Sequence, residues 1–324
     1  MTTDIFKKMP AVTLITSDID LWINNIYVKA ATSDNTRKAY RHDIRHFETW
    51  GGRLPATSDS IARYLETYAD KLNPRTLARR LIALRHWHTY QGFVDPTLHP
   101  AINKTLVGIM RIHGKPKGKA HALTPDELTQ IVAHLTNNHS LAAARDNALL
   151  QIGFFGALRR SELVAIFYEH IQWEKAGIEI LLPTSKTDQT HEGQYCVIPY
   201  GNEKLCPVRA LGNWLTQAQI NKGPIFRRIR INDQLGLEAL TPLSVNHILK
   251  QRAQAAGIAN THMLSSHSLR RGLATSAARA GVPLQTIMRA GRWKQTNTVM
   301  EYIEASERFT ENAAANVLQK IQDK

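Results

Sequence analysis

A short stretch rich in glycine, proline and lysine divides the sequence into two parts. Its centre reads Gly-Lys-Pro-Lys-Gly-Lys at positions 114–119, a composition that predicts an extended, solvated connection rather than a helix or a strand. A helix is predicted to start directly afterwards, because Thr124 can cap it, Pro125 suits its first position and two acids follow. The chain of 324 residues suits two domains of ordinary size. The predicted division is a leader, a first domain, a linker and a second domain, at 1–14, 15–112, 113–122 and 123–324.

The first part has the periodicity of helices and few signals for strands. Tyr40, Ile44 and Phe47 recur at helical spacing within one segment, which Gly51 and Gly52 end. Similar spacing of apolar residues recurs along this part. The predicted helices of this all-helical domain are 18–27, 36–50, 58–72, 75–90 and 101–111.

The second part mixes two kinds of pattern. Two β-type runs flank a polar stretch and predict an antiparallel hairpin with a long basic and polar tip, at 177–182 and 194–199. The remaining patterned segments predict helices at 123–134, 141–155, 206–218, 244–256, 267–280, 284–290, 296–302 and 307–322. The predicted fold class is therefore mainly α within an α+β arrangement. It combines an all-helical first domain with a mostly helical second domain that contains a small antiparallel sheet.

Positive charge is concentrated near the end of the first part and in the linker. The formal net charge is +14, which makes an acidic polymer, and nucleic acid first, the expected partner. Between positions 74 and 119 there are nine basic residues and one acid, Asp95. A solvated helix surface is the ordinary alternative, but such surfaces usually mix both signs of charge. The candidate DNA contacts are Thr36, Lys38, Arg75, Thr76, Arg79, Arg80, Arg111, Lys115, Lys117 and Lys119.

Composition disfavours several other classes of protein. The two cysteines, Cys196 and Cys206, form no Cys-x-x-Cys pair, and no His/Cys cluster has the spacing of zinc ligands. The most apolar stretch, 148–158, is far too short to cross a bilayer, and positions 1–10 lack the apolar run of a signal peptide. These features predict an intracellular protein without a disulfide framework, a structural metal or a membrane attachment.

Two short motifs in the second part place arginines where an anion could bind. Arg159 directly follows a very apolar helix, and a semi-buried guanidinium there needs an anionic partner. Glu162 lies three residues further on, so an ordinary helix ion pair is the simpler explanation. His267 and Arg270 are also three apart, at a predicted helix start that presents N–H groups to a phosphate. For such a pair alone, a coincidental surface pair is the better explanation.

Two further motifs supply other candidates. Trp293 brings an indole N–H that needs a partner when buried, and Tyr302 lies late in a short apolar turn. Taken singly, both aromatic residues are more often part of a core. Lys186 lies at the start of the predicted hairpin tip, where a lysine is usually just exposed. The chain order of all these motifs, rather than any one of them, changes this assessment.

Their order resembles that of the tyrosine recombinase family, also called the phage integrases. The resemblance runs from about position 17 to 318 and is especially close to Cre-like recombinases at His267-Ser-Leu-Arg-Arg-Gly and Val299-Met-Glu-Tyr-Ile. His267 and Tyr302 are 35 residues apart, a spacing typical of the family. The ordered set is Arg159, Lys186, His267, Arg270, Trp293 and Tyr302.

The resemblance implies a role for each of these side chains. Tyr302 is the implied nucleophile, which attacks a backbone phosphate and keeps the bond energy in a phosphotyrosine. Arg159 and Arg270 are the implied clamp on the non-bridging oxygens, because arginine binds phosphate oxygens two at a time. Lys186 is the implied general acid for the leaving 5′-oxygen. The implied supporting residues, which bond to the phosphate or orient the clamp, are His267, Trp293 and Glu162. Neither a metal nor another cofactor is implied.

The resemblance also implies an assembly. The two domains form a clamp around duplex DNA, and strand exchange passes through a 3′-phosphotyrosyl intermediate and a Holliday junction. In Cre-like proteins a terminal helix, here about 307–322 with an apolar stripe, docks into a neighbouring protomer and builds a cyclic tetramer. Packing of this helix on its own domain is the alternative. The implied partner is an inverted-repeat DNA site, and the implied location is the cytoplasm of a bacterium, on bacterial, plasmid or phage DNA.

One departure and several rival functions limit this hypothesis. Positions 241–244 lack a basic residue where the Cre-like pattern places a base-reading arginine, so target preference is not carried over. A type IB topoisomerase uses the same side chains but acts as a monomer without a defined site. A non-enzymatic DNA-binding protein on a decayed recombinase fold is a second rival. A metal nuclease is disfavoured because the sequence lacks clustered carboxylates.

Overall fold

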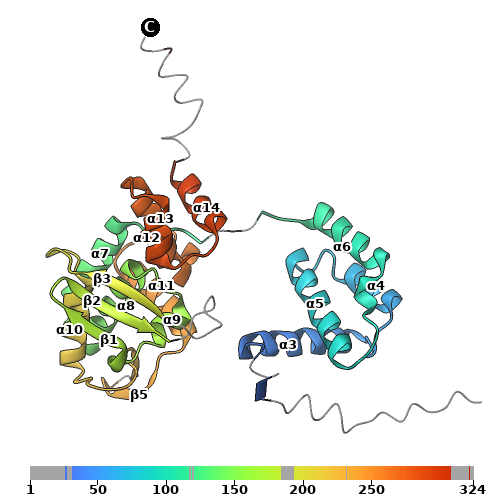
Figure 1. Ribbon diagram of the computed structural model, residues 1–324, viewed down its shortest axis with the longest axis horizontal. Helices are drawn as coiled ribbons and strands as arrows, with labels where there is room; N and C mark the ends of the chain where they lie inside the picture. The colour runs from blue at the N-terminus through green and yellow to red at the C-terminus, as the bar shows by residue number, and fades with distance from the viewer. Residues whose placement is uncertain are drawn as a thin grey trace, which may run out of the picture. The chain divides into compact units, whose positions relative to one another are not determined.

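The computed structural model divides the chain into two compact units, residues 1–118 and 119–324, which are described in turn (Figure 1). The structure describes residues 26–27, 31–116, 118, 120–183, 193–230, 232–307 and 321. In this described part, no helix is long and apolar enough to span a membrane.

Helices build the described part of the first unit. The first three begin after a residue whose side chain accepts a hydrogen bond from the first turn, namely Ser33, Thr57 and Asn73. Their apolar faces meet in one core, which includes Phe47 and Tyr64. The helices are α3 (Asp34–Trp50), α4 (Ser58–Thr67), α5 (Pro74–Tyr90) and α6 (Pro100–His113), with a 3₁₀ turn at Pro96–Leu98.

Helix α4 ends at Thr67, earlier than the predicted range of 58–72. Tyr68 leaves the helical conformation, and its ring packs against those of His46 and Tyr64 with centroid distances of 4.7 and 5.2 Å. Residues 68–71 form turns. Aromatic packing at the edge of the core therefore coincides with the end of the helix, although the sequence pattern continues.

Arg80, predicted as a DNA contact, lies buried inside this unit, which argues against a contact with DNA. Only 5% of Arg80 is exposed, and its Nη1 donates to the Tyr64 hydroxyl at 2.8 Å. Its Nε lies 3.6 Å from a carboxylate oxygen of the buried Asp43. The same carboxylate accepts two hydrogen bonds of 2.8 Å from Arg79. This acid comes from α3, so a count of charges along α5 alone could not include it.

The variant Asp43→Asn should lower the free energy of unfolding by about 3 kcal/mol or more, because it leaves Arg80 buried without its counter-ion. Urea denaturation of the wild type and the variant measures the difference. Asp59→Asn is the matched control, since Asp59 and its partner Arg63 are both exposed and such pairs contribute at most about 1 kcal/mol. A loss no larger than that of the control would contradict the importance of this buried charge pair.

The second unit is built around helix α8 (Leu141–Phe155), which is buried along most of its length. The other helices are α7 (Pro125–Thr136), α9 (Arg160–Val164), α10 (Pro207–Gln217), α11 (Pro242–Ala255), α12 (Ser266–Arg279), α13 (Leu284–Gly291) and α14 (Thr296–Glu307). Helices α7, α10 and α12 pack against α8, and α12, α13 and α14 gather at one end of the unit (Figure 1). The mainly helical architecture with a small antiparallel sheet confirms the predicted fold class.

The predicted hairpin is confirmed, and further strands accompany it. The strands are β1 (Ile171–Glu174), β2 (Gly177–Leu182), β3 (Gln194–Pro199), β4 (Arg227–Ile229) and β5 (Leu235–Ala239). The first three form one antiparallel sheet in the order β1-β2-β3, with Ile180 opposite both Ile171 and Cys196. Strands β1, β4 and β5 were not predicted because they are short and largely exposed, without the alternation that marks a strand. Residues 184–192 of the predicted tip lie outside the described residues.

The last residues of the predicted linker are hydrogen-bonded to the second unit. The amide of His121 donates to the carbonyl oxygen of Met263 at 3.1 Å. Directly after the predicted linker, the amide of Leu123 donates to the carbonyl oxygen of Ser268 at 3.0 Å. The carbonyl oxygen of Ala120 accepts a hydrogen bond from a side chain of α12. Residues 120 and 121 of the predicted linker therefore have backbone groups that pair with the folded surface rather than with water alone.

Candidate active site

A sharp turn after α8 places the first candidate, Arg159, at the start of α9. At Gly156 in this turn, any side chain would come within 2.8 Å of the Ile152 carbonyl oxygen. Ala157 follows with a φ of +45°, a left-handed conformation that is unfavourable for a residue with a side chain. Arg159 then precedes the first turn of α9, and its backbone amide donates to the Glu162 carboxylate at 2.9 Å.

The carboxylate of Glu162 lies at the centre of a positive cluster. Only 4% of Glu162 is exposed, and it accepts a hydrogen bond of 2.5 Å from Nη1 of Arg159. The Nη2 atom of Arg292 lies 4.0 Å from its other oxygen. The ordinary ion pair that the sequence suggested therefore exists, but it is part of a larger group of arginines around one buried acid.

Arg270 completes this cluster from α12, and only 3% of it is exposed. Its Nη1 donates to the Ala157 carbonyl oxygen, and its guanidinium carbon lies 4.2 Å from the centroid of the Trp293 ring. Burial, together with the positive charges of Arg159 and Arg292, lowers the pKa of Arg270 to about 9. Its Nη2 is buried and has no hydrogen-bond partner among the described residues. An anion at this atom would supply the missing acceptor and offset the excess positive charge.

Arg292 is a member of the cluster that the sequence analysis missed. It has a φ of +55° and directly follows α13. Its Nη2 donates to the Gly156 carbonyl oxygen at 2.8 Å, while its Nε is buried without a partner in the described part of the chain. Arg292 directly precedes the predicted Trp293 in the sequence, and a basic residue at that place was the available signal.

Tyr302 lies on α14, half-buried beside the arginines. Its ring meets that of Trp293 edge to face, with a centroid distance of 6.1 Å and an interplanar angle of 65°. The indole in turn packs so closely on Gly291 that a side chain there would come within 1.7 Å of it. The structure thus brings five predicted residues together, through direct contacts and through the electrostatic interaction of Arg270 with the Arg159–Glu162 pair: Arg159, Glu162, Arg270, Trp293 and Tyr302.

Apart from the buried Arg80, the other predicted residues lie at the surface or outside the described residues. His267 is exposed in the first turn of α12, three positions before Arg270. Three predicted lysines and most of the predicted terminal helix fall outside the described residues, namely Lys117, Lys119, Lys186 and the larger part of 307–322. The exposed or half-exposed DNA-contact candidates of the first unit are Thr36, Lys38, Arg75, Thr76, Arg79, Arg111 and Lys115.

The thiol of Cys196 also borders the cluster, 3.6 Å from the Gly156 carbonyl oxygen. Burial raises the pKa of Cys196, so the thiol stays protonated at neutral pH and is a poor nucleophile. Among the described residues, no group of three or more His, Cys, Asp or Glu side chains is placed to hold a metal ion. Tyr302, whose ring contacts Trp293, remains the nucleophile candidate beside the cluster.

The variant Glu162→Gln should lower the free energy of unfolding by about 3–5 kcal/mol, because Arg159 and Arg292 lose the buried carboxylate between them. Added phosphate should restore part of this loss, since a bound anion stabilises the folded state by mass action. Thermal denaturation with and without phosphate measures both effects. The matched control Glu238→Gln removes an exposed acid of β5 and should change stability by less than about 0.5 kcal/mol. Equal losses in the two variants would contradict the role of Glu162 as the counter-ion.

Two protein-family models match successive parts of this chain. A family model described as "Phage integrase family" matches residues 121–308, and one described as "Phage integrase, N-terminal SAM-like domain" matches residues 19–91. The chain belongs to the phage integrase family. This confirms the resemblance inferred from the chain order of the motifs, and it makes the protein a tyrosine recombinase, an enzyme of the DNA strand transferase class.

Individual relatives agree with this assignment. The recombinase is 37% identical over 303 residues to the "Integrase/recombinase xerD homolog" of Selenomonas ruminantium, covering 90% of this chain and 88% of that protein. It is 25% identical over 303 residues to "Recombinase cre" of Escherichia phage P1, covering 85% of each. Its sequence is thus nearer to the first of these two than to Cre. A solved structure of the Tn1549 transposon integrase with transposon right end DNA has the same fold, with a TM-score of 0.61 at 13% identity over 94% of this chain and 98% of that one.

Proposed function

We propose that this recombinase is site-specific and that Tyr302 cuts duplex DNA by attacking a backbone phosphate. The observation that carries the proposal is the buried Nη2 of Arg270, which lacks a partner among the described residues. Arg270, Arg159 and Arg292 surround one carboxylate, so the cluster has more positive than negative charge. A phosphate group offers both the acceptor and the negative charge that this site lacks.

The proposed reaction is an exchange of esters at phosphorus. The phenolic oxygen of Tyr302 forms a bond to phosphorus, and the bond from phosphorus to the 5′-oxygen breaks. The product is a 3′-phosphotyrosyl ester and a free 5′-hydroxyl, and the reverse attack by a 5′-hydroxyl reseals the strand. His267 is our candidate to accept the phenolic proton, and Lys186 is our candidate to protonate the departing 5′-oxygen. The energy of the broken ester is kept in the new one, so resealing needs no additional energy source.

The arginines act on the charge that grows during this exchange. Arg159 and Arg270 hold the two non-bridging oxygens, because planar guanidinium groups match phosphate geometry and remain charged. Arg292 adds positive charge from the opposite side of Glu162, and that carboxylate keeps the arginines together in the absence of DNA. Trp293 covers the face of Arg270 and the edge of Tyr302, which supports a positioning role in addition to the phosphate contact inferred from the family.

The DNA partner and the domain assignment extend the proposal to the first unit. This unit is proposed as the SAM-like core DNA-binding domain, and its exposed basic residues contact the duplex beside the cleavage site. Among these candidates Arg75 is exposed at the start of α5, and its Nη1 donates to the Lys115 carbonyl oxygen at 3.2 Å. The structure of the related Tn1549 integrase with transposon end DNA supports duplex DNA as the partner.

The assembly is proposed by analogy with Cre-like enzymes. The functional unit is a homotetramer on an inverted-repeat DNA site, held together by the terminal helix at about 307–322. Strand exchange then proceeds through a Holliday junction, in the cytoplasm where the DNA lies. Light scattering of the protein alone and with its DNA site tests this part, and a monomer that relaxes supercoiled DNA at many sites would favour the topoisomerase alternative instead.

The experiment that tests the proposal is to trap covalent adducts on fragments of the replicon that carries the gene. The wild type should give adducts at one defined position, with protein on the 3′ side of the break and a free hydroxyl on the 5′ side. Sequencing of the trapped ends identifies the position. Protein linked to 5′ ends, or breaks without any linked protein, would contradict the proposed chemistry.

A further inference from the structure

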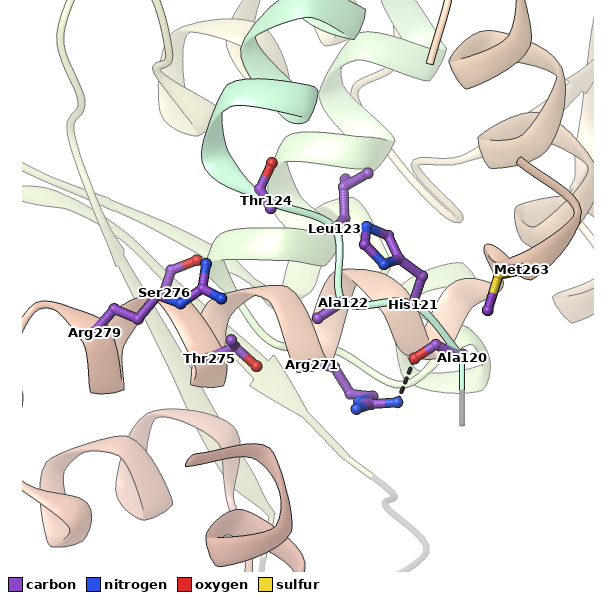
Figure 2. Close-up of a pocket in the computed structure, with 10 residues that line it drawn as sticks. All are labelled: Ala120, His121, Ala122, Leu123, Thr124, Met263, Arg271, Thr275, Ser276 and Arg279. Carbon is purple, nitrogen blue, oxygen red and sulfur yellow. Dashed lines mark hydrogen bonds between the residues drawn. The ribbon is translucent and has the colours of Figure 1, made fainter. Parts of the chain in front are cut away.

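Arg271 follows Arg270 on α12 but contacts a different set of groups. Only 8% of Arg271 is exposed, and its Nη1 donates to the carbonyl oxygen of Ala120, as Figure 2 shows. Its guanidinium carbon also lies 5.1 Å from the centroid of the Tyr302 ring. One buried cation therefore contacts both the end of the connecting segment and the residue proposed as the nucleophile.

The Ala120 carbonyl belongs to a short stretch of chain that the second unit holds by its backbone. Hydrogen bonds from the amides of His121 and Leu123 fix this stretch at Met263 and Ser268, with lengths of 3.1 and 3.0 Å. Ala120 is the first described residue of this stretch, because Lys119 lies outside the described residues. A displacement of the connecting segment would therefore act first on the acceptor of Arg271.

The hold of Arg271 on Tyr302 depends on few other contacts. Its Nε is buried and has no hydrogen-bond partner among the described residues. A cavity of 320 Å³ lies beside it, lined among others by Leu123, Thr275 and Arg279 (Figure 2). Because the cavity offers space and the Nε has no acceptor among the described residues, we expect a change at Ala120 to weaken the placement of the guanidinium against the ring.

We propose that Arg271 is a positioning residue that holds the ring of Tyr302 and makes this hold depend on residues 120–123. This inference rests on the proposed role of Tyr302 as the nucleophile. A cation over an aromatic face favours one placement of the ring, and displacement of a reacting atom by about 1 Å can slow a reaction on the order of 10²-fold. The connecting segment thereby influences the rate of cleavage without touching the DNA phosphate itself.

The first test needs no DNA and measures amide hydrogen exchange in the full-length chain. Arg271→Met should speed exchange in peptides that cover 120–123 and 296–303, while Arg271→Lys should resemble the wild type more closely. Arg279→Met is the matched control, because Arg279 lies on the same helix and the same cavity but is exposed. Unchanged exchange at 296–303 in Arg271→Met would overturn the proposal.

The second test measures cleavage in a single turnover on the DNA position mapped with the wild type. Arg271→Met should form the covalent adduct roughly 10–100-fold more slowly at unchanged DNA affinity, and Arg271→Lys should recover part of the rate. If the wild type forms no adduct, the proposed function is refuted. The contact of Arg271 with Tyr302 is then still tested by hydrogen exchange. A normal rate in Arg271→Met would overturn the inference alone.

The third test addresses the connecting segment. His121→Pro removes the amide that bonds to Met263 and loosens the position of Ala120, whereas His121→Ala keeps this amide and removes only the side chain. We expect His121→Pro to speed amide exchange at 296–303 and to slow adduct formation, as Arg271→Met does. His121→Ala should resemble the wild type in both measurements. If the two substitutions at position 121 have equal effects, the dependence on residues 120–123 is refuted.

Discussion

Tyr302→Phe should form no covalent adduct with DNA and should recombine on the order of 10⁴-fold or more slowly than the wild type. The substitution removes only the phenolic oxygen, which is the atom proposed to bond to phosphorus. The ring keeps its place against Trp293 and Arg271, so the fold and the DNA affinity should not change. Denaturing gels that separate protein–DNA adducts from free DNA measure the loss directly.

The matched control for this substitution is Tyr195→Phe, which removes an exposed hydroxyl from β3. This variant should retain the full cleavage rate. A Tyr302→Phe protein that binds DNA normally and still forms adducts would show that another side chain is the nucleophile. If neither the wild type nor Tyr302→Phe forms adducts and the biological function of the variant is unchanged, the rival explanation of a non-enzymatic DNA-binding protein is favoured.

Arg270→Lys should slow adduct formation by about 10²–10³-fold in a single turnover. Lysine keeps the positive charge but lacks the planar fork that in Arg270 donates to the Ala157 carbonyl oxygen and leaves Nη2 available for a phosphate. The shorter side chain also gives up the contact with the Trp293 ring. Saturating DNA in the assay separates this loss in rate from any loss in affinity.

Arg279→Lys is the control, because it makes the same exchange at an exposed position of the same helix. It should leave the rate unchanged. Thermal denaturation of Arg270→Lys distinguishes a defect in chemistry from a defect in folding, since the buried guanidinium also bonds to the turn after α8. A rate within a few-fold of the wild type would contradict the role of Arg270 in binding the transition state.

Local patterns predicted those elements that repeat one spacing over several residues. Helix α8 matches the predicted range of 141–155, and strands β2 and β3 match 177–182 and 194–199. Strand β1 was missed because just one of its residues, Ile171, is buried. Its sequence therefore shows neither the alternation of a strand nor the spacing of a helix. The pair β4 and β5 was missed because none of its residues is buried.

Those residues of the candidate site that belong to the ordered family motifs could be predicted from the sequence without knowledge of their contacts. The motifs around Arg159, Arg270, Trp293 and Tyr302 lie apart in sequence, and the fold gathers these residues at one site. What escaped prediction depends on partners from other elements. The sequence of α5 alone predicts Arg80 as a surface cation, because its partner Asp43 belongs to another helix. Arg271 and Arg292 each donate a hydrogen bond to a backbone carbonyl oxygen, and these acceptors lie 151 and 136 positions away in the chain.

The central claim is that one oxygen atom, on Tyr302, becomes covalently linked to DNA. The most direct measurement is mass spectrometry of the adduct after digestion of both protein and DNA. We predict a nucleotide linked through its 3′-phosphate to the peptide that contains Tyr302, with fragment ions that locate the added mass on that residue. A nucleotide on any other side chain, or on the 5′ side of the break, would contradict the account.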